Sequence, residues 1–328
     1  MNKQTILRRF ILPIVGIAFL CAMPTMVSPY NLSVLIFLFI NLILVVSYRF
    51  VTNMGLWSFA HISSMGIGAY TAGLLVTRLG WPFWGALPIA VLASALVGLI
   101  IGLPCLRTRG FYFFLSTFAA GEAIRWAWIL FREPFGSYSG IGVIPRPEQI
   151  PGMNFALSTS YYYLALGFTL LSLVILYRLE KSRIGATVNA IRSSEDLSES
   201  IGINTPRYQT AVFATASAFA GLAGVLLAFY TGTITPNSFS FMYSMEILVF
   251  VIVGGPTSFF GPIVGACALT AVGEALSGFM QYMPLVYGTV LICVVLFQPD
   301  GLINLPKRIL SLVEKYTGRR MAANDNRK

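Results

Sequence analysis

The chain has 328 residues, of which 56% are hydrophobic and only 10% are charged, and its mean hydropathy is +0.77. A soluble globular domain carries about a quarter charged residues, so this composition excludes an ordinary soluble protein and indicates a helical membrane protein. The net charge of +10 is typical of loops that orient a membrane chain, and we do not take it as a sign of nucleic-acid binding.

Long apolar runs follow one another along the chain and define the predicted fold. The first run follows Lys3, Arg8 and Arg9 as in a signal peptide, but it lacks a clear cleavage site, and we expect it to be retained as a helix. The sequence therefore predicts an all-α polytopic membrane protein with a single transmembrane domain over residues 1–328. The ten predicted spans are 10–27, 31–50, 56–77, 84–104, 111–131, 160–178, 209–230, 244–256, 260–279 and 283–298.

The basic residues fall mainly on one side of this predicted topology. With the N-terminus inside, 18 of the 22 Lys and Arg residues lie in inside segments, and three (Arg78, Arg132 and Arg146) lie in outside segments. Because inside loops of membrane proteins are enriched in Lys and Arg, this distribution predicts that both termini are cytoplasmic.

Two of the spans are unusual. Segment 244–256 is too short to cross a hydrocarbon core of about 30 Å as a straight helix, and it ends in Gly254-Gly255-Pro256. Segment 56–77 is rich in small and polar residues, which let backbone break where it lines a cavity. Both segments are predicted to be discontinuous or re-entrant, and their comparable places in the two halves indicate an internal repeat around a central path. The candidate path residues are His61, Ser64, Gly66, Gly68, Glu122, Gly254, Gly255 and Glu274.

Ionisable residues inside spans are costly and are weighed separately. Glu122 and Arg125 lie three apart and are expected to form a structural ion pair on one helix face, with a role in the path as the alternative. Glu274 is expected mid-helix, as a relay or as a packing residue. Glu246 is placed near the outer interface. His61 is expected to hydrogen-bond across helices rather than to titrate.

A long polar loop at 178–209 interrupts the apolar runs. It carries five basic and four acidic residues, and it has the pattern of short helices. Ser193 or Ser194 is expected to cap a second helix, and Ile201-Gly202 to end it. A structured loop of this kind on the membrane face predicts a docking element for a soluble partner.

The sequence has no recognisable catalytic set. It holds one histidine, no phosphate-binding loop of the GxxxxGK[ST] kind, and four cysteines without paired spacing. We therefore expect a non-catalytic chain with no metal and no cofactor, whose energy comes from a partner or from an ion gradient.

Several stretches, in this order and spacing, resemble the M-type (LivM-like) permease subunits of branched-chain amino acid ABC importers. They are GLWSFAH (55–61) with GIGAYT (66–71), LRTRGFY (106–112) with GE (121–122), SRIG (182–185) with AIR (190–192) and GI (202–203), ILVFVIVGG (247–255) with GP (261–262), and FQPDGL (297–302). The resemblance covers most of residues 30–305.

The resemblance implies an ABC importer permease fold in a bacterial inner membrane. It implies four kinds of partner besides lipid: a second, H-type permease, two cytoplasmic ATPases and a periplasmic substrate-binding protein. The loop 179–208 then becomes a coupling element seated in an ATPase groove, with Ile191 as its apolar anchor and two glycines as hinges, and 299–328 a cytoplasmic tail. The expected coupling residues are Gly185, Ala190, Ile191, Arg192, Glu195, Glu199 and Gly202.

Other function classes stay open at this point. An importer with the same architecture and a different cargo, such as urea or a short-chain amide, is one. A secondary transporter driven by an ion gradient, with Glu274 as its relay, is another, and a channel is a third.

Overall fold

The computed structural model describes residues 19–25, 27–149, 154–155, 157–276, 278, 282–298 and 301–304. In this part of the chain the helices dominate, and the extended backbone pairs only at an isolated antiparallel bridge between Ile141 and Ile234. The prediction of an all-α fold is confirmed.

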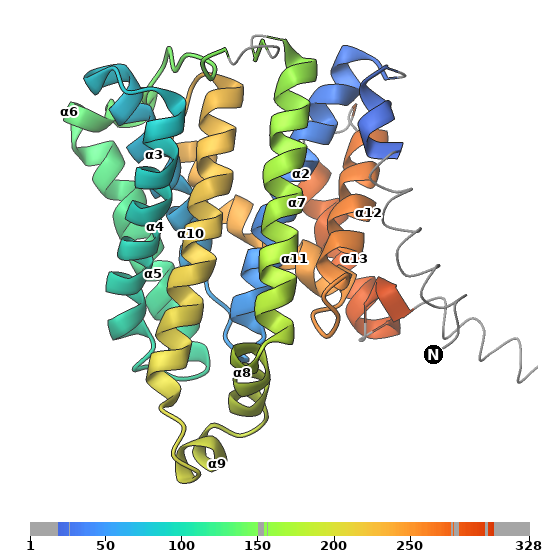
Figure 1. Cartoon of the computed structure of the whole chain (residues 1–328). Helices are drawn as coiled ribbons and strands as arrows, with labels where there is room; N and C mark the ends of the chain where they lie inside the picture. The colour runs from blue at the N-terminus through green and yellow to red at the C-terminus, as the bar shows by residue number, and fades with distance from the viewer. Residues whose placement is uncertain are drawn as a thin grey trace, which may run out of the picture.

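The helices form a bundle, and two short helices project beyond one of its ends (Figure 1). The long helices are α2 (Pro29–Thr52), α3 (Ala60–Leu79), α4 (Phe83–Cys105), α5 (Phe111–Leu130), α7 (Ser158–Lys181) and α10 (Thr205–Thr231). The shorter apolar helices are α11 (Phe241–Gly254), α12 (Gly261–Ala275) and α13 (Met283–Phe297). The projecting helices are α8 (Arg183–Ser193) and α9 (Glu195–Ser200), and the connections hold α6 (Arg132–Phe135) and the 3₁₀ turns η1 (Met23–Thr25), η2 (Ser137–Ser139), η3 (Pro236–Phe239) and η5 (Leu302–Asn304).

The predicted spans from residue 31 onward match these helices with ends that differ by a few residues. By length and composition, α2, α4, α7, α10 and the stretch Pro236–Gly254 are long and apolar enough to cross a membrane, and shorter apolar helices accompany them. The chain is thus a multi-pass membrane protein. Of the first predicted span, residues 10–18 and 26 lie outside the described residues.

The helix ends follow from local sequence. Ser28 caps α2 by accepting a hydrogen bond from the Asn31 amide at 3.4 Å, and Pro29 occupies the first helical position, where a missing amide costs nothing. Gly80 ends α3 in the left-handed region, with φ of 65°, which a glycine adopts without steric cost.

The core lies where α10 meets α3 and α4, and small residues make that contact possible. A Cβ on Gly68 of α3 would lie 2.3 Å from the carbonyl oxygen of Gly221 on α10. The predicted break within 56–77 is wrong beyond residue 59, because α3 runs without interruption from Ala60 to Leu79. Gly66 and Gly68 permit close packing against neighbours and do not interrupt the helix.

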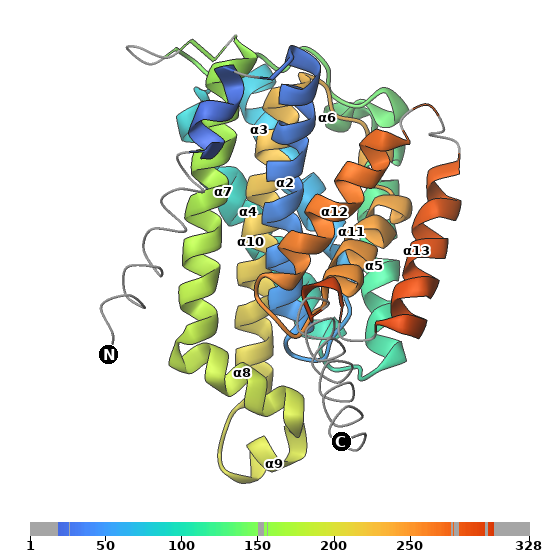
Figure 2. The same cartoon turned by 90° about the vertical axis from the view of Figure 1, so that its right-hand side faces the viewer.

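The other unusual segment, 244–256, is short as predicted, but α11 runs through it without a break up to Gly254. Helix α11 has 14 residues and is therefore only about 21 Å long. The chain that precedes it is not α-helical: it passes the bridge at Ile234 and the turn η3, where Phe239 packs near Tyr70 and Trp128. This crossing is therefore divided between the turn η3 and the helix α11, and Figure 2 shows α11 as a short helix beside α12.

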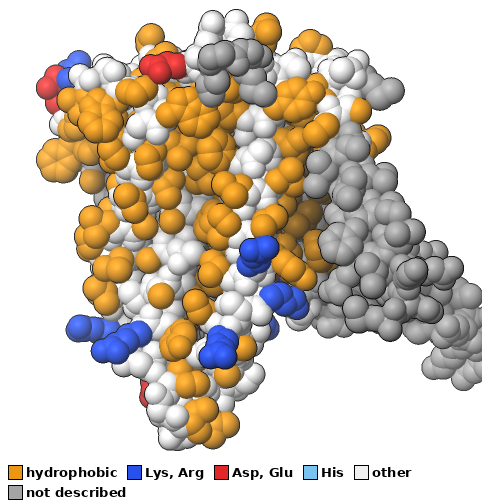
Figure 3. Space-filling model, viewed as in Figure 1, with side chains coloured by type: hydrophobic (Ala, Val, Ile, Leu, Met, Phe, Trp, Pro, Cys, Tyr) orange, Lys and Arg blue, Asp and Glu red, His pale blue; other side chains and the backbone are white. Residues whose placement is uncertain are grey.

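Charge is unevenly distributed over the surface. In Figure 3 the middle of the visible face is apolar, and Lys and Arg side chains gather toward the end that carries α8 and α9. This arrangement is typical of a membrane protein whose basic loops lie on one side.

Candidate functional site

The two projecting helices, called here the α8–α9 hairpin, are built by local hydrogen bonds. The Ser182 hydroxyl accepts from the Ile184 amide at 3.2 Å, and the Ser194 hydroxyl accepts from the Leu197 amide at 3.3 Å. Helix α9 ends with the Gly202 amide bonded to the Glu199 carbonyl and the Ile203 amide bonded to the Ser198 carbonyl, which is a Schellman motif. The predicted second cap and helix stop are confirmed.

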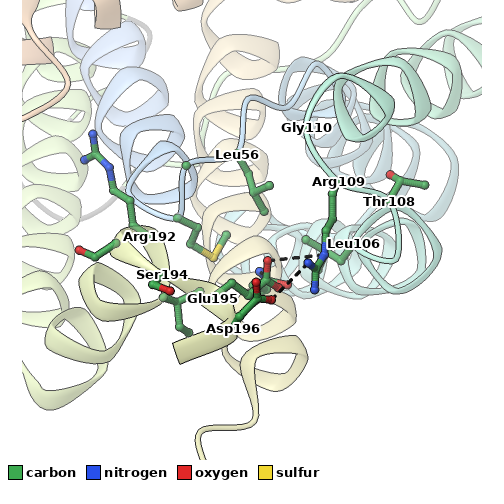
Figure 4. Close-up of a pocket in the computed structure, with 14 residues that line it drawn as sticks. Leu56, Leu106, Thr108, Arg109, Gly110, Arg192, Ser194, Glu195 and Asp196 are labelled. Carbon is green, nitrogen blue, oxygen red and sulfur yellow. Dashed lines mark hydrogen bonds and ion pairs between the residues drawn. The ribbon is translucent and has the colours of Figure 1, made fainter. Parts of the chain in front are cut away.

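Side-chain bonds hold the hairpin against the bundle (Figure 4). Arg109, from the loop between α4 and α5, lies 3.7 Å from Glu195 and 3.5 Å from Asp196. On α10, the Gln209 amide donates to Glu195 at 3.2 Å, and the Thr205 hydroxyl donates to Glu199 at 2.5 Å. Glu195 and Glu199 were expected as coupling residues for a partner, and the structure engages both carboxylates within the chain.

Helix α8 turns a different face to the bundle than the sequence predicted. Ile191 is 3% exposed and packs inward, while its neighbours Ala190 and Arg192 are exposed. The expectation that Ile191 is the apolar anchor for a partner is wrong, because its side chain packs into the bundle. Ala190 and Arg192 point elsewhere, since successive helical residues are about 100° apart.

The two expected hinges differ from each other. Gly185 is the third residue of α8, and a Cβ there would lie 2.0 Å from the carbonyl oxygen of Glu180. Gly185 is thus a packing residue that seats α8 against the end of α7, and not a hinge. Gly202 has φ of +87° in open space, as its place at the helix stop requires.

The outward apolar residues of the hairpin were missed by sequence reasoning. Leu197 of α9 is 64% exposed, and Ile201, the residue that caps the end of α9, is 70% exposed; their spacing of four places them on one side of the hairpin. We call this pair the docking face. Ser198 beside Leu197 is buried and marks the inner face of α9, and the spacing of four between the two apolar residues is the signal that was available in the sequence.

A cavity of about 390 Å³ lies between the hairpin and the loops that follow α2 and α4. Its lining mixes both signs of charge with apolar and small residues. The residues are Met54, Gly55, Leu56, Leu106, Thr108, Arg109, Gly110, Ile191, Arg192, Ser193, Ser194, Glu195, Asp196 and Gln209.

Inside the bundle, two predicted path residues make hydrogen bonds between helices. The His61 Nε2 atom and the Ser47 hydroxyl are 3.0 Å apart, linking α3 to α2. The Ser64 hydroxyl donates to the Ser217 hydroxyl at 3.2 Å, linking α3 to α10. The expectation that His61 bonds across helices is confirmed, and Gly66 lies against the ring of Trp128.

Three acidic residues take different places. Arg125 binds Glu122 at 2.7 Å, which confirms the structural ion pair. Glu274 is not mid-helix as expected: it is the second-last residue of α12, and it lines a mostly apolar cavity near the first turn of α2, where Tyr30 interacts with it. It therefore lies apart from the other path candidates.

Glu246 is the third of these residues and does not lie at the outer interface as predicted. It accepts a 3.4 Å hydrogen bond from Tyr287 of α13. One turn earlier on α11, the Tyr243 hydroxyl donates to Asn41 at 2.6 Å, and Asn41 lies near the midpoint of α2. Glu246 thus lies at mid-bundle depth, because the first turn of α11 begins inside the bundle.

A buried arginine was also missed. Arg49 is 3% exposed, and its two terminal nitrogens bind both carboxylate oxygens of Glu180, while its Nε donates to the Pro256 carbonyl at 3.1 Å. In the predicted topology, Arg49 is only one of the 18 basic residues in the inside segments. Its partners lie 131 and 207 residues away along the chain, and no local pattern indicates them.

The remaining predicted path glycines, Gly254 and Gly255, lie at the turn between α11 and α12. A Cβ on Gly254 would lie 2.0 Å from the Gly261 carbonyl oxygen, so Gly254 permits close helix packing, while Gly255 ends α11 with φ of 104°, which favours glycine. Among the described residues, His, Cys, Asp and Glu side chains form no group of three or more that would hold a metal ion.

Comparisons with known proteins agree with this architecture. Residues 30–297 match the family model described as branched-chain amino acid transport system / permease component. The chain is 31% identical over 315 residues to the high-affinity branched-chain amino acid transport system permease protein LivM of Salmonella typhimurium, covering 89% of this chain and 74% of the relative, and it matches LivM of Escherichia coli to the same extent. It is 33% identical over 129 residues to LivH of Salmonella typhimurium, covering 38% of this chain and 41% of that protein.

No solved structure matches the chain. The helical bundle, the apolar spans and the family model that covers most of its length all lead to one conclusion: this protein belongs to the permease components of branched-chain amino acid transport systems.

Proposed function

We propose that the chain is a permease subunit of an ATP-driven ABC importer in a bacterial inner membrane, and that it carries branched-chain amino acids. Its partners are then a second, LivH-like permease, two ATPases on the inner side and a periplasmic binding protein. The names of its LivM and LivH relatives support the cargo and the pairing. The single observation that carries the ATPase partnership is the α8–α9 hairpin with its docking face.

The orientation follows from charge. Arg109 contacts α9, Arg107 lies in the same loop, and Lys181 and Arg183 lie where α7 joins α8. These basic residues are at the end of the bundle that carries the hairpin, and basic residues favour the inner side of a membrane. The hairpin then faces the cytoplasm, where ATPases are found. Both chain termini belong on the same side in this proposal.

The hairpin has the chemistry of a docking element. Apolar side chains as exposed as Leu197 and Ile201, outside the membrane-spanning helices, lose contact with water when a partner covers them. Full burial of one such side chain stabilises a complex by about 1.5–3 kcal/mol, whereas an exposed ion pair contributes about 0–1 kcal/mol. The two docking-face residues therefore dominate the binding of an ATPase.

The test uses the double variant Leu197→Asp with Ile201→Asp in the importer coexpressed with its ATPases. We expect the variant to reach the membrane and to lose the ATPases on purification, because the hairpin lies outside the bilayer. The matched control is Tyr138→Asp, which puts a charge on an exposed aromatic at the opposite end, in η2. Wild-type ATPase copurification with the double variant contradicts the docking proposal.

Cargo is tested separately. Uptake of labelled leucine, isoleucine or valine that needs both ATP and the binding protein supports the proposal. Uptake of urea or a short-chain amide in preference to these amino acids contradicts the proposed cargo, but it is consistent with an ABC importer. Uptake that follows an ion gradient and ignores ATP contradicts the importer. The peripheral position of Glu274 favours the importer over a transporter that uses this residue as its relay.

A further inference from the structure

Arg49 joins three parts of the chain at the inner end of the bundle. It lies in the last turn of α2, and its two terminal nitrogens each donate to one oxygen of the Glu180 carboxylate. Its third donor, Nε, reaches the carbonyl of Pro256 in the turn between α11 and α12. The guanidinium carbon also lies 5.9 Å from the ring centroid of Phe259 in the same turn. Such a planar, three-point grip is available to arginine and not to lysine.

On one side, the grip leads to the α8–α9 hairpin. Glu180 is the second-last residue of α7, and the next helix begins three residues later. Gly185 of α8 lies directly against the backbone of Glu180, where a Cβ would not fit. The Ser182 hydroxyl bonds both the Leu179 carbonyl and the Ile184 amide. These contacts make the junction of α7 and α8 stiff, so a displacement of α8 moves Glu180.

On the other side, the grip leads to α11 and α12. Gly254, Gly261 and Gly265 let these two short helices pack backbone to backbone, so the pair moves as one body. Helix α11 carries Tyr243 and Glu246, which lie at mid-bundle depth. A pull on the Pro256 carbonyl is therefore transmitted to polar groups in the middle of the membrane.

The burial of the pair is an independent reason to assign it a role. A carboxylate at the C-terminal end of a helix is opposed by the helix dipole, and Glu180 occupies that place in α7 with a side chain only 13% exposed. Substituting well-packed hydrophobic residues for a buried ion pair often leaves a protein equally stable. A contribution to stability therefore does not by itself explain the Arg49–Glu180 pair.

We propose that Arg49 is a positioning residue that couples α8 to the α11–α12 turn, through Glu180 on one arm and the Pro256 carbonyl on the other. This inference rests on the proposed ATPase docking to the hairpin. When the ATPases close and displace α8, Arg49 carries the displacement to α11 and alters the mid-membrane polar groups.

The test compares Arg49→Gln and Glu180→Gln with wild type in the purified importer. Spin labels are placed at the exposed positions Ala186 in α8 and Thr257 in the turn, each paired with a reference label at Tyr138, after replacement of the four native cysteines. Distances are measured before and after trapping with ATP and vanadate, together with cargo transported per ATP hydrolysed. Arg78→Gln, which removes an exposed positive charge at the other end, is the control.

In wild type we expect both label pairs to change distance on trapping. In the two variants we expect the Ala186 pair to respond as before and the Thr257 pair to lose its response, with transport per ATP reduced roughly tenfold, within the usual range of coupling between sites. Arg49→Lys keeps the positive charge but cannot bind both carboxylate oxygens at once. Its Thr257 response and its transport per ATP should therefore lie between those of wild type and those of Arg49→Gln. It gives the answer if Arg49→Gln does not reach the membrane.

Two results overturn the inference. One is a wild-type Thr257 response with wild-type transport per ATP in Arg49→Gln or, failing its assembly, in Arg49→Lys. The other is a variant that loses thermal stability while the amount of cargo transported per ATP hydrolysed stays at the wild-type value, which makes the Arg49–Glu180 pair purely structural. Absence of any nucleotide response at Ala186 in wild type is a different failure: it removes the proposed ATPase docking itself, and the coupling role with it.

Discussion

The hydroxyl of Tyr243 donates a 2.6 Å hydrogen bond to the side-chain oxygen of Asn41, and this bond fixes the first turn of α11 to the midpoint of α2. A helix that starts inside the bundle has no first turn at the membrane surface to set its depth, and a hydrogen bond to a neighbouring helix supplies a fixed contact instead. The relationship explains how a 14-residue helix keeps its depth in a membrane.

This bond is open to a double-mutant cycle. Tyr243→Phe and Asn41→Leu each leave a buried polar group without its partner, whereas the double variant removes both groups. We expect a coupling free energy of about 0.6 kcal/mol, with about 1.7 kcal/mol as an upper value, as for other hydrogen bonds between membrane helices. Unfolding of the purified permease in detergent measures it, and strictly additive single effects contradict the bond.

The contact between α3 and α10 predicts a contrast between two glycines. A Cβ on Gly68 meets the Gly221 backbone at 2.3 Å, whereas a Cβ on Gly167 of α7 meets nothing within 4 Å. Gly68→Ala should therefore destabilise the fold by about 1–3 kcal/mol through overpacking. Gly167→Ala should be neutral or stabilise by a few tenths to about 1 kcal/mol. Thermal unfolding of both variants decides it, and equal tolerance argues against the close approach.

The bond between His61 and Ser47 predicts a split between stability and transport. Ser47→Ala leaves a buried ring nitrogen without its partner and should cost about 1–3 kcal/mol of stability. The KM for cargo should stay at the wild-type value, because both residues are buried between helices. If Ser47→Ala changes the KM for cargo and leaves stability unchanged, His61 contributes to the translocation path instead.

The proposed orientation predicts which exposed sites a membrane-impermeant thiol reagent reaches. In a background lacking the four native cysteines, Asp196→Cys in α9 should be labelled only after the membrane is opened. Tyr138→Cys in η2 should be labelled in intact cells, since it lies at the other end of the bundle. Labelling of the α9 site in intact cells, in the manner of the η2 site, inverts the topology.

Glu246 is the acidic residue that we expect to matter most for transport. A carboxylate at mid-membrane depth is costly to keep, which makes a functional role the first expectation. Glu246→Gln keeps an oxygen that can accept from Tyr287 but removes the negative charge. Because hydrogen bonds to charged groups contribute about 1.5–3 kcal/mol and neutral ones about 1 kcal/mol, the transport rate should fall on the order of tenfold. Glu274→Gln, at the outer end of α12, should have a smaller effect. Initial uptake rates at equal membrane levels measure both, and the reverse order refutes the assignment.

The sequence by itself determined where the helices are. A run of apolar residues has few alternatives in a membrane, where each backbone polar group needs a partner within its own segment. Caps such as Ser194 and stops such as Gly202 act on the next few residues, and local sequence was therefore sufficient to predict them. The family also followed from sequence, because it depends on ordered motifs and not on contacts.

Tertiary structure alone decided what the residues of those helices touch. Helix α8 packs against the bundle through Gly185, Val188 and Ile191, so the Ile191 side chain is buried. Leu197 is exposed on α9. Both residues are hydrophobic, and hydrophobicity alone does not predict which of them a neighbour buries. Glu274 moved to the end of its helix because α12 stops at Ala275. The sequence indicated only that Arg49 is a basic residue on the inner side. Its partners Glu180 and Pro256 are remote along the chain and lie beside it only when the bundle has packed.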